Sequence, residues 1–446
     1  MSGRLVVVGG DAGAMGAAAQ ARRRDPSLEI VALERGNWTS YSACGIPYLV
    51  GGVVEGGVDR LVARTPQRFR DDLRIDVRLR HEVTAIDLDN ASVEVHNEEH
   101  RRTFHMGFDR LLLGTGARPT RPELPGIDLP FIHGVQTLDD AERLLQHARQ
   151  TDCQRIVVVG GGYIGLEMAE AFVQRGMRVT IVDNGPHVLR VLDPDMAGRV
   201  EDAIRRLGID LRTASEVTGF DDGLVVTKAG PLAADLVVLG LGVTPNSELA
   251  SAAGLETGVR DAISVNPQQR TSHEAVWAAG DCCESYHLVS RQHVYIALGT
   301  VANRQARVAG TNLGGGYATF AGVVGTAVTK LCGTEVGRTG LSESECAAAG
   351  LGFVTATIES TSKAGYLPGA EPVTVKVLAE RGSGRLLGAQ IVGGGGAAKR
   401  IDVVAVALHA GLTAAELAEA DLGYAPPFGP LWDPVTVAAR EAAKQA

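Results

Sequence analysis

The chain contains one sequence unit twice, and this internal repeat limits the folds open to it more than any other feature. Residues 4–10 read RLVVVGG and residues 155–161 read RIVVVGG. Short continuous apolar runs of this kind are typical of strands buried on both faces of a parallel sheet. Each run leads through a glycine turn into a helical segment, and then into a second apolar run that ends in an acid, Glu34 or Asp183. The two copies predict an α/β protein with two Rossmann-like, three-layer domains.

The glycine turn and the acid have a chemical meaning together. Glycines let the backbone approach a pyrophosphate at the positive end of a helix, and the acid accepts hydrogen bonds from ribose hydroxyls. The second copy carries the full G-x-G-x-x-G pattern in Gly160, Gly162 and Gly165. In the first copy Asp11 and Ala14 stand at the second and third glycine positions. We therefore predict two dinucleotide sites, of which the second has the stronger pattern.

The residue after the second acid indicates which nicotinamide nucleotide binds. Asn184 follows Asp183, where an arginine would favour a 2′-phosphate. We therefore expect NADH rather than NADPH. NADPH stays open, because Arg178 or Arg190 could reach a 2′-phosphate.

Two matching segments indicate where the chain passes between the domains. Residues 108–119 read FDRLLLGTGARP and residues 235–245 read DLVVLGLGVTP, each an apolar run that enters a glycine turn and then a proline. From about residue 321 the pattern changes to alternating, strand-like runs and an alanine-rich helix, which predicts an α+β domain. The predicted division is residues 1–118 with 246–320, residues 119–245, and residues 321–446.

Composition excludes several other classes of protein. The 446 residues carry a net charge of -9 with no long run of one sign, which argues against a nucleic-acid-binding surface. No apolar stretch reaches the roughly 18 residues of a membrane span. The six cysteines are scattered and show no paired zinc spacing, so we expect neither a disulfide framework nor a metal site. The first apolar run begins at Arg4, so we expect no signal peptide and a cytoplasmic location.

Residues 41–48, YSACGIPY, contain the candidate nucleophile, Cys44. Pro47 suits the first turn of a helix. A thiol at a helix N-terminus has a lowered pKa, so we expect a reactive thiolate. The alternative is a buried packing cysteine. The place of Cys44 just after the acid of the first unit favours the redox role.

These motifs together resemble those of the pyridine nucleotide-disulfide oxidoreductases, in the branch with a single redox cysteine. The resemblance rests on YSACGIPY, GTGARP, GGGYIGLEMAE, the 271–281 stretch and GYAPPFGPLWDP, and it covers essentially the whole chain. It implies FAD in the first unit, with Glu34 at its ribose and Asp281 at its ribityl chain, a nicotinamide cofactor in the second unit, and a homodimer built by the C-terminal domain. The cofactor-binding residues that it implies are Gly9, Gly10, Ala12, Gly13, Ala14, Glu34, Arg35, Val83, Thr115, Gly116, Gly280, Asp281, Gly160, Gly162, Tyr163, Ile164, Gly165, Glu167, Asp183 and Gly242.

Departures from related enzymes narrow the implied chemistry. Leu49 stands where glutathione-reductase-type enzymes have a second cysteine, so Cys44 is expected to cycle through a mixed disulfide, sulfenic acid or persulfide. Tyr424 and Tyr366 match tyrosines of the coenzyme A-disulfide reductases that reach the cysteine of the partner subunit. A phenol there can donate a proton to a leaving thiolate. The alternative for each tyrosine is an amphipathic interface residue.

The acceptor is the least determined part of the prediction. Ala12 replaces the histidine found in NADH peroxidases and oxidases of the branch, which argues against peroxide or oxygen as the electron acceptor. Ala43 replaces an asparagine common before the cysteine, which weakens a coenzyme A substrate. Arg22, Arg23 and Arg70 could supply charge for its phosphates, although the arginine run is more typical of a solvated helix face.

We therefore predict an FAD-dependent, NADH-using reductase of coenzyme A disulfide or a similar low-molecular-weight disulfide. The alternatives are an NADH oxidase or peroxidase that reduces oxygen or peroxide at the flavin and Cys44, a persulfide reductase, and a non-catalytic flavoprotein that senses NADH.

Overall fold

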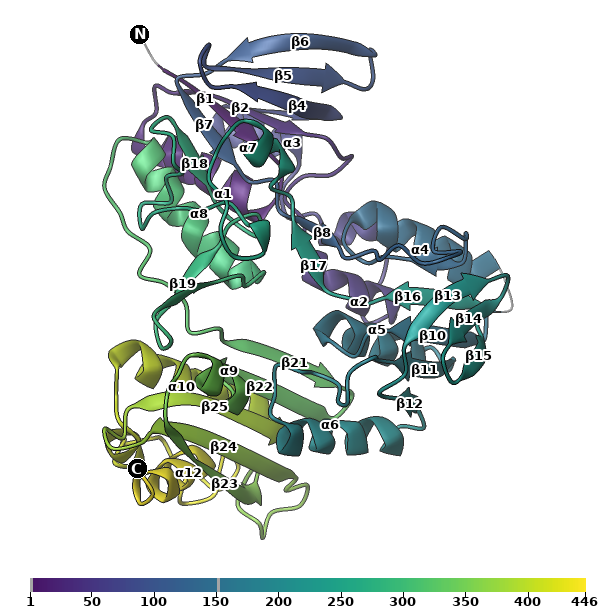
Figure 1. The fold of residues 1–446 in the computed structure, drawn as a ribbon, viewed down its shortest axis with the longest axis vertical. Helices are drawn as coiled ribbons and strands as arrows, with labels where there is room; N and C mark the ends of the chain where they lie inside the picture. The colour runs from purple at the N-terminus through teal and green to yellow at the C-terminus, as the bar shows by residue number, and fades with distance from the viewer. Residues whose placement is uncertain (1–2, 151–152) are drawn as a thin grey trace.

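The computed structural model describes residues 3–150 and 153–446, which form three lobes (Figure 1). The first lobe is built on a five-stranded parallel sheet with the order β18-β7-β1-β2-β3. Its strands are β1 (Arg4–Val8), β2 (Glu29–Glu34), β3 (Ile75–Leu79), β7 (Arg110–Leu113) and β18 (Val276–Ala278). All but the first residue of β1 are buried, as expected of a central parallel strand.

Helices cover one face of this sheet and a small antiparallel sheet covers the other. On one face α1 (Ala12–Arg24) packs closely against α8 (Gly299–Leu313). Gly310 allows this close approach, because a Cβ at that position would lie only 2.3 Å from the carbonyl oxygen of Ala17. On the other face lie β4 (His81–Asp87), β5 (Ser92–Asn97) and β6 (Arg102–Gly107). The lobe is completed by short elements: η1 (Ala43–Gly45), α2 (Ile46–Val50), η2 (Val58–Leu61), α3 (Pro66–Leu73), α7 (Glu248–Ala252), η3 (Val259–Asp261), β19 (Ser285–His287) and β20 (Gln292–Val294).

The second lobe repeats this plan. Its parallel sheet has the order β9-β16-β10-β11-β12, with β9 (Ile132–His133), β10 (Arg155–Val159), β11 (Arg178–Val182), β12 (Asp210–Arg212) and β16 (Leu236–Leu239). It too has a three-stranded antiparallel sheet, made of β13 (Val217–Asp221), β14 (Leu224–Thr227) and β15 (Gly230–Ala233). Its helices are α4 (Leu138–Gln150), α5 (Tyr163–Gln174) and α6 (Pro194–Arg206). The predicted pair of Rossmann-like domains is therefore confirmed.

The chain crosses between these lobes twice, on neighbouring strands. β8 (Ala117–Pro119) pairs antiparallel with β17 (Val243–Pro245), and Arg118 lies opposite Thr244. The two segments predicted as crossings thus run side by side. The exact domain limits stay a prediction.

The third lobe is α+β, as expected. Its antiparallel sheet has the order β21-β22-β25-β24-β23, with β21 (Ala327–Leu331), β22 (Thr334–Gly340), β23 (Phe353–Thr361), β24 (Pro372–Glu380) and β25 (Leu386–Gly393). Its helices are α9 (Glu343–Ala348), α10 (Ala397–Ala410), α11 (Ala414–Ala418) and α12 (Pro434–Ala443). Gly411, with φ +69°, ends α10.

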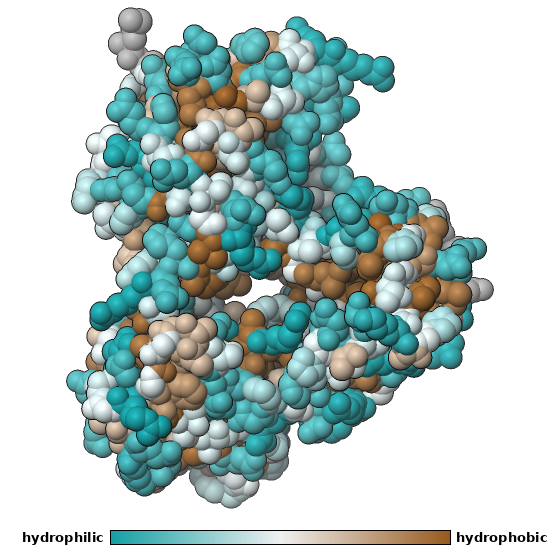
Figure 2. All heavy atoms as spheres, in the orientation of Figure 1, coloured by the Kyte–Doolittle hydropathy of each residue, from teal (hydrophilic) through white to brown (hydrophobic). Residues whose placement is uncertain are grey.

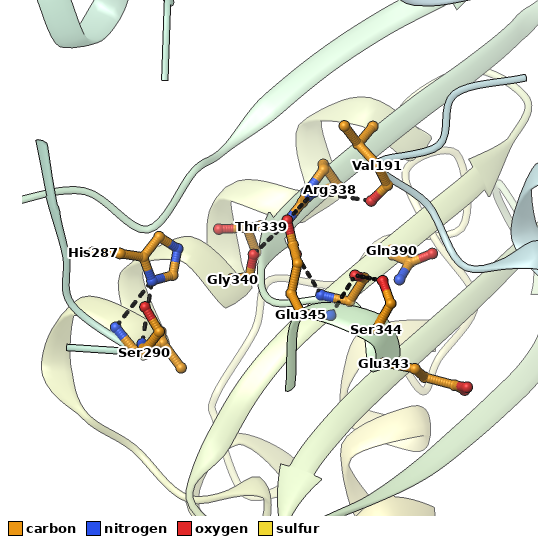
Figure 3. A network of polar contacts seen from close by, with 12 residues as sticks. Val191, His287, Ser290, Arg338, Thr339, Gly340, Glu343, Ser344, Glu345 and Gln390 are labelled. Carbon is orange, nitrogen blue, oxygen red and sulfur yellow. Dashed lines mark hydrogen bonds and ion pairs between the residues drawn. The ribbon is translucent and has the colours of Figure 1, made fainter. Parts of the chain in front are cut away.

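A buried polar network joins the third lobe to the second. Asp193, the residue before α6, binds both the amide of Gln390 (2.7 Å) and the ammonium of Lys376 (3.1 Å). One strand further, Arg338 donates to the carbonyl oxygen of Val191 at 2.9 Å and to Glu345 at 2.7 Å (Figure 3). The loop that leads into α6 is therefore held by the third lobe.

Within the described residues, no helix has both the length and the apolar character needed to cross a membrane. In the same part of the chain, no three His, Cys, Asp or Glu side chains are grouped so that they could hold a metal ion.

Candidate active site

The two glycine turns have the same close-packed geometry. Gly9 has φ +113° and Gly160 has φ +107°, a conformation that favours glycine. A Cβ on Gly9 would lie 2.2 Å from the carbonyl oxygen of Gly114, and one on Gly160 would lie 2.4 Å from that of Gly240. In both lobes, the glycine turn after the first strand thus packs closely against the residue that follows β7 or β16. Each of these strands comes directly after the antiparallel sheet in the chain.

The two predicted ribose acids also take equivalent positions. Glu34 accepts a hydrogen bond from the amide of Gly36 at 2.6 Å, and Asp183 accepts one from Gly185 at 2.7 Å. Asp183 further accepts from the amide of Gly161 at 2.7 Å. Burial raises the pKa of Glu34, against the amides that favour its charged form. Each acid therefore lies directly against its own glycine turn.

The helix starts fit the phosphates of dinucleotides. Neither Asp11 nor Gly162, the residues before α1 and α5, caps its helix with a side-chain hydrogen bond, so backbone amides stay open there. A Cβ on Gly165 would meet the carbonyl oxygen of Gly160 at 1.9 Å, so only glycine allows this turn. Tyr163 begins α5, and its buried hydroxyl has no partner among the described residues. Burial raises its pKa to about 12.

The turn before Asp281 lies against the start of α1. A Cβ on Gly13 would be 2.5 Å from the carbonyl oxygen of Ala279, and Gly280 donates to Gln305 at 2.9 Å. Burial raises the pKa of Asp281 to about 6.

Asp11 lies at the first glycine turn, where the sequence indicated only a departure from the glycine pattern and not a candidate site residue. Burial raises its pKa to about 6, against hydrogen bonds from the amides of Tyr41 and Ala12, and the charges of Glu34 and Asp281 act in the same direction as burial. The sequence signal for Asp11 was an acid at the second glycine position, because the backbone there is the part of the turn that approaches the pyrophosphate.

Cys44 lies in η1, immediately before α2, and α2 packs against α5 of the second lobe. Its thiol is free and the residue is exposed. The expectation of a lowered pKa is wrong for the protein alone: partial burial of the thiol raises its pKa, and the negative charges of Glu167, Asp281 and Asp11 raise it further. Burial, together with these carboxylates, outweighs any lowering of the pKa by the short helix start.

Glu167 connects this cysteine to the third lobe. It lies on α5 and accepts a hydrogen bond from Thr329 of β21 at 3.1 Å. Burial raises its pKa, and nearby Glu170 raises it further. Glu170 itself pairs with Lys330 at 2.7 Å. Elements of all three lobes thus meet beside Cys44, and Figure 2 shows an open hollow where the lobes come together.

The crossing strands hold the next predicted residues, Thr115, Gly116 and Gly242. Asn246, which sequence reasoning missed, binds this segment through its side-chain amide to the Thr115 carbonyl oxygen (2.9 Å) and through its backbone amide to Gly116 (2.9 Å). Its role depends on the pairing of β8 with β17, which no local pattern reveals.

Other predicted residues are placed as follows. Gly10 lies against the Glu34 side chain, Arg35 is exposed after β2, Val83 is buried in β4 and Ile164 lies in the first turn of α5.

The two predicted tyrosines lie on outer loops of the third lobe. Tyr366 is 75% exposed and Tyr424 is 46% exposed. Their loops touch, since the amide of Ala364 donates to the carbonyl oxygen of Pro426 at 3.0 Å. Within the described part of one chain, no hydrogen bond joins either tyrosine to Cys44.

The structure corrects both interpretations of Arg22, the solvated helix face and the coenzyme A phosphate site. The Arg22 side chain is buried, and its guanidinium donates to the carbonyl oxygens of Leu73 (2.7 Å), Pro26 (2.9 Å) and Arg74 (3.0 Å). Arg70 pairs with Asp76 at 3.3 Å. Arg22 is therefore a structural residue.

Comparisons with known proteins agree with this architecture. Residues 3–306 match the pyridine nucleotide-disulphide oxidoreductase family, and residues 326–434 match its dimerisation domain. The chain is 36% identical over 446 residues to the NAD(P)H coenzyme A polysulfide/persulfide reductase of Pyrococcus horikoshii, covering 99% of this chain and 98% of that protein. It is 30% identical over 427 residues to the coenzyme A disulfide reductase of Staphylococcus epidermidis, covering 95% of this chain and 96% of that protein.

A solved structure agrees as well. The water-forming NADH oxidase from Lactobacillus brevis, bound to NADH, superposes with a TM-score of 0.95 at 26% identity, covering 99% of this chain and 98% of that one. The repeated nucleotide folds, the antiparallel third domain and these matches lead to one conclusion: the chain belongs to the pyridine nucleotide-disulphide oxidoreductase family.

Proposed function

We propose that this protein is an FAD-dependent, NADH-using reductase of coenzyme A disulfide or a similar low-molecular-weight disulfide, with Cys44 as its redox thiol. One observation carries the proposal. Cys44 is a free, exposed thiol in the first domain, on the segment that packs against the nucleotide-binding helix α5 of the second domain. A single sulfur between two nucleotide folds suits electron transfer to a small disulfide.

The residues around the first glycine turn suit FAD. The turn from Gly9 to Ala14 would face its pyrophosphate, Glu34 its ribose and Asp281 its ribityl chain. When bound, FAD accepts a hydride from NADH and supplies the two electrons that return Cys44 to the thiol state. The second turn and Asp183 would hold NADH in the same way.

Cys44 performs the chemistry of the acceptor. Its sulfur, as a thiolate, attacks one sulfur of the substrate disulfide; a Cys44–substrate disulfide forms as the substrate bond breaks, and the first thiolate leaves. That leaving group takes a proton and departs as a thiol. Two electrons and a second proton then release the other thiol and restore Cys44. Because partial burial and nearby carboxylates raise the pKa of Cys44, the first step is expected to speed up with rising pH.

A homodimer would complete the site. The loop that carries Tyr424 also exposes three large apolar side chains, Phe428 (79%), Leu431 (66%) and Trp432 (61%). Large apolar side chains exposed on one loop favour an interaction site, and the match to a dimerisation domain supports a second copy as the partner. Tyr366 and Tyr424 lie on touching loops of this surface, from where we propose that they reach the partner subunit's site and protonate the leaving thiolate.

The test is anaerobic NADH oxidation with coenzyme A disulfide as the only acceptor. Wild-type protein should turn over and Cys44→Ser should lose at least about a hundredfold in kcat, because serine cannot form the mixed disulfide. Cys332→Ser, which alters another accessible thiol, should keep normal turnover. Undiminished turnover in Cys44→Ser would refute the thiol mechanism.

The same protein preparation distinguishes two other electron acceptors, oxygen and a persulfide, from coenzyme A disulfide. Oxygen uptake that matches NADH loss with no disulfide added would establish an NADH oxidase instead. NADH oxidation that requires an added persulfide, and is absent with coenzyme A disulfide, would establish a persulfide reductase.

A further inference from the structure

The loops that carry the two predicted tyrosines come from distant parts of the third domain. Tyr366 lies in the loop 362–371, between β23 and β24, and Tyr424 lies in the loop 419–433, between α11 and α12. Both tyrosines are exposed, so neither side chain is held in place by burial. Their positions therefore depend on how the backbones of the two loops are held.

Arg400, in the first turn of α10, connects the two loops. Its Nη2 donates to the carbonyl oxygen of Ser362 at 3.1 Å and to that of Phe428 at 2.8 Å. Ser362 lies four residues before Tyr366, and Phe428 lies four residues after Tyr424. Only 11% of the Arg400 side chain is exposed. One buried nitrogen thus joins the two backbones at the same separation along the chain from each tyrosine.

The guanidinium of Arg400 is held in one orientation. Its Nε pairs with Oδ2 of Asp433 at 3.2 Å, while Oδ1 of Asp433 accepts from the amide of Val435 at the start of α12 at 2.9 Å. A Cβ on Gly396 would lie 3.3 Å from Nη1, and one on Gly429 would lie 3.2 Å from Nη2. Glycine at these two positions leaves the space that the planar group fills, and a planar fork with partners at two nitrogens cannot turn freely.

A direct hydrogen bond joins the same loops at a second point. The amide of Ala364 donates to the carbonyl oxygen of Pro426 at 3.0 Å. In the sequence, Ala364 lies between Ser362 and its tyrosine, and Pro426 lies on the corresponding side of Phe428. Two segments joined at two points cannot rotate past each other, as they could about a single hydrogen bond. The bridge through Arg400 therefore fixes the relative position of the two tyrosines.

We propose that Arg400 positions Tyr366 and Tyr424 together for proton transfer to the thiolate that leaves the substrate disulfide. Arg400 is a positioning residue, because its guanidinium is taken up by a carboxylate and two carbonyl oxygens and acts through the loops. A tyrosine hydroxyl gives its proton to the departing sulfur as the sulfur–sulfur bond breaks, and the phenolate recovers a proton from water. The inference rests on the proposed function, in which both tyrosines reach the site of the partner subunit.

Amide hydrogen exchange of the FAD-loaded protein tests whether one residue holds both loops. Arg400→Lys keeps the positive charge but replaces the planar fork with a single ammonium. Exchange should become about tenfold faster in both 362–371 and 419–433, and should stay within about twofold elsewhere. Arg385→Lys is the matched control, since it removes another partly buried guanidinium of the third domain, paired with Glu380 at 3.2 Å, and it should change neither loop. Faster exchange in only one loop, or in neither, would overturn the proposal.

The choice of leaving group separates proton transfer from general damage to the site. Reduced protein is mixed with coenzyme A disulfide or with the disulfide of nitrothiobenzoate, and release of the first thiol is followed. A nitroaryl thiolate leaves without a proton, whereas an aliphatic thiolate leaves far more readily with one. Arg400→Lys should slow release of coenzyme A by about tenfold and release of the nitroaryl thiolate by less than about twofold, and Arg385→Lys should slow neither. Equal slowing of both releases by Arg400→Lys would overturn the proposal.

A double-mutant cycle shows whether Arg400 acts through the tyrosines. Release of coenzyme A should already be slow when Tyr366→Phe and Tyr424→Phe are combined, and adding Arg400→Lys should cost less than about twofold more. A further tenfold loss would overturn the inference. Normal release by the tyrosine variant would refute the proposed role of the tyrosines and this inference with it. Slow release by the tyrosine variant, together with normal release by Arg400→Lys, would refute this inference alone.

Discussion

Thr329 donates a hydrogen bond to Glu167 across 3.1 Å, and so ties the first strand of the third domain to the nucleotide-binding helix of the second. Burial raises the pKa of Glu167, and the hydrogen bond from Thr329 opposes that rise. The protonation of an acid close to Cys44, the proposed redox thiol, is thus adjusted by a residue from another domain.

Removing this hydrogen bond should shift a pH profile. In Thr329→Val the pKa of Glu167 should rise further, because the hydrogen bond that favours its charged form is lost. The inflection in the rate of anaerobic flavin reduction by NADH should then move to higher pH. Thr357→Val, at an exposed position of β23, should leave the profile in place. Identical profiles for wild type and Thr329→Val would show that Glu167 does not titrate in this step.

Alanine substitutions at Gly165 and Gly198 distinguish the effect of close packing at a turn from the effect of helix propensity. Gly165→Ala places a methyl group within 1.9 Å of the carbonyl oxygen of Gly160, so the turn must open. We expect NADH affinity to fall by at least about tenfold, as the helix start moves from its phosphate. In α6, a Cβ on Gly198 meets nothing within 4 Å, so Gly198→Ala should keep NADH affinity and add about 0.5 kcal/mol of stability. Normal NADH binding by Gly165→Ala would contradict the assignment of this turn.

The partly buried acids Asp11 and Asp281 should make the flavin-free protein less stable as pH rises. Burial raises the pKa of each to about 6 from 3.8, so the neutral carboxyl is favoured in the folded state. Their stabilising contribution is complete below about pH 4 and is lost as pH rises through about 6, at about 3 kcal/mol for each group. Urea midpoints measured across this range should therefore fall.

Asp11→Asn tests the part of this loss that belongs to Asp11. The variant should gain stability over the wild type at pH 8 and show little gain at pH 4, because the wild-type carboxyl is already neutral there. Asp89→Asn, in the exposed turn after β4, should follow the wild type. A gain of equal size at both pH values would count against titration of Asp11.

Lys376 should be required for the junction of the second and third domains. Only 4% of its side chain is exposed, and its ammonium contacts Asp195 at 2.8 Å and Glu343 at 2.7 Å besides Asp193. Lys376→Met leaves the buried carboxylate of Asp193 without its cation, which should cost about 3 kcal/mol in urea unfolding.

Two variants separate this charge effect from lost packing. Lys399→Met removes an exposed pair with Asp402 and should cost under about 0.5 kcal/mol. Adding Asp193→Asn to Lys376→Met should recover part of the loss, because the unpaired charge is gone. Equal costs for Lys376→Met and Lys399→Met would refute the proposed role of the buried network.

Local patterns were sufficient to predict the repeated folds. The apolar runs of β1 and β10, their glycine turns and the acids Glu34 and Asp183 follow one another within short segments, so the sequence contains the whole unit. The partners of the junction could not be found in this way. Gln390 and Asp193, for example, meet because two domains dock, and neither residue lies in a pattern.

The direction of the pKa shift of Cys44 could not be predicted from the sequence either, because it depends on residues that only the fold brings together. The rule that a helix start lowers a thiol pKa uses only the neighbours of Cys44 in the sequence. Glu167 and Asp281, which oppose it, come from distant elements. Arg22 shows the same limit, because its place in a basic run favoured a solvated helix face, whereas the fold surrounds its guanidinium with carbonyl oxygens.

The most direct test of the central claim is an absorbance titration of the FAD-loaded protein with NADH under anaerobic conditions. If the Cys44 sulfur lies against the flavin and shares its electrons, a long-wavelength band should appear in the wild type and in Cys332→Ser, and should be absent from Cys44→Ser. The same band in Cys44→Ser, or none in the wild type, would contradict the account.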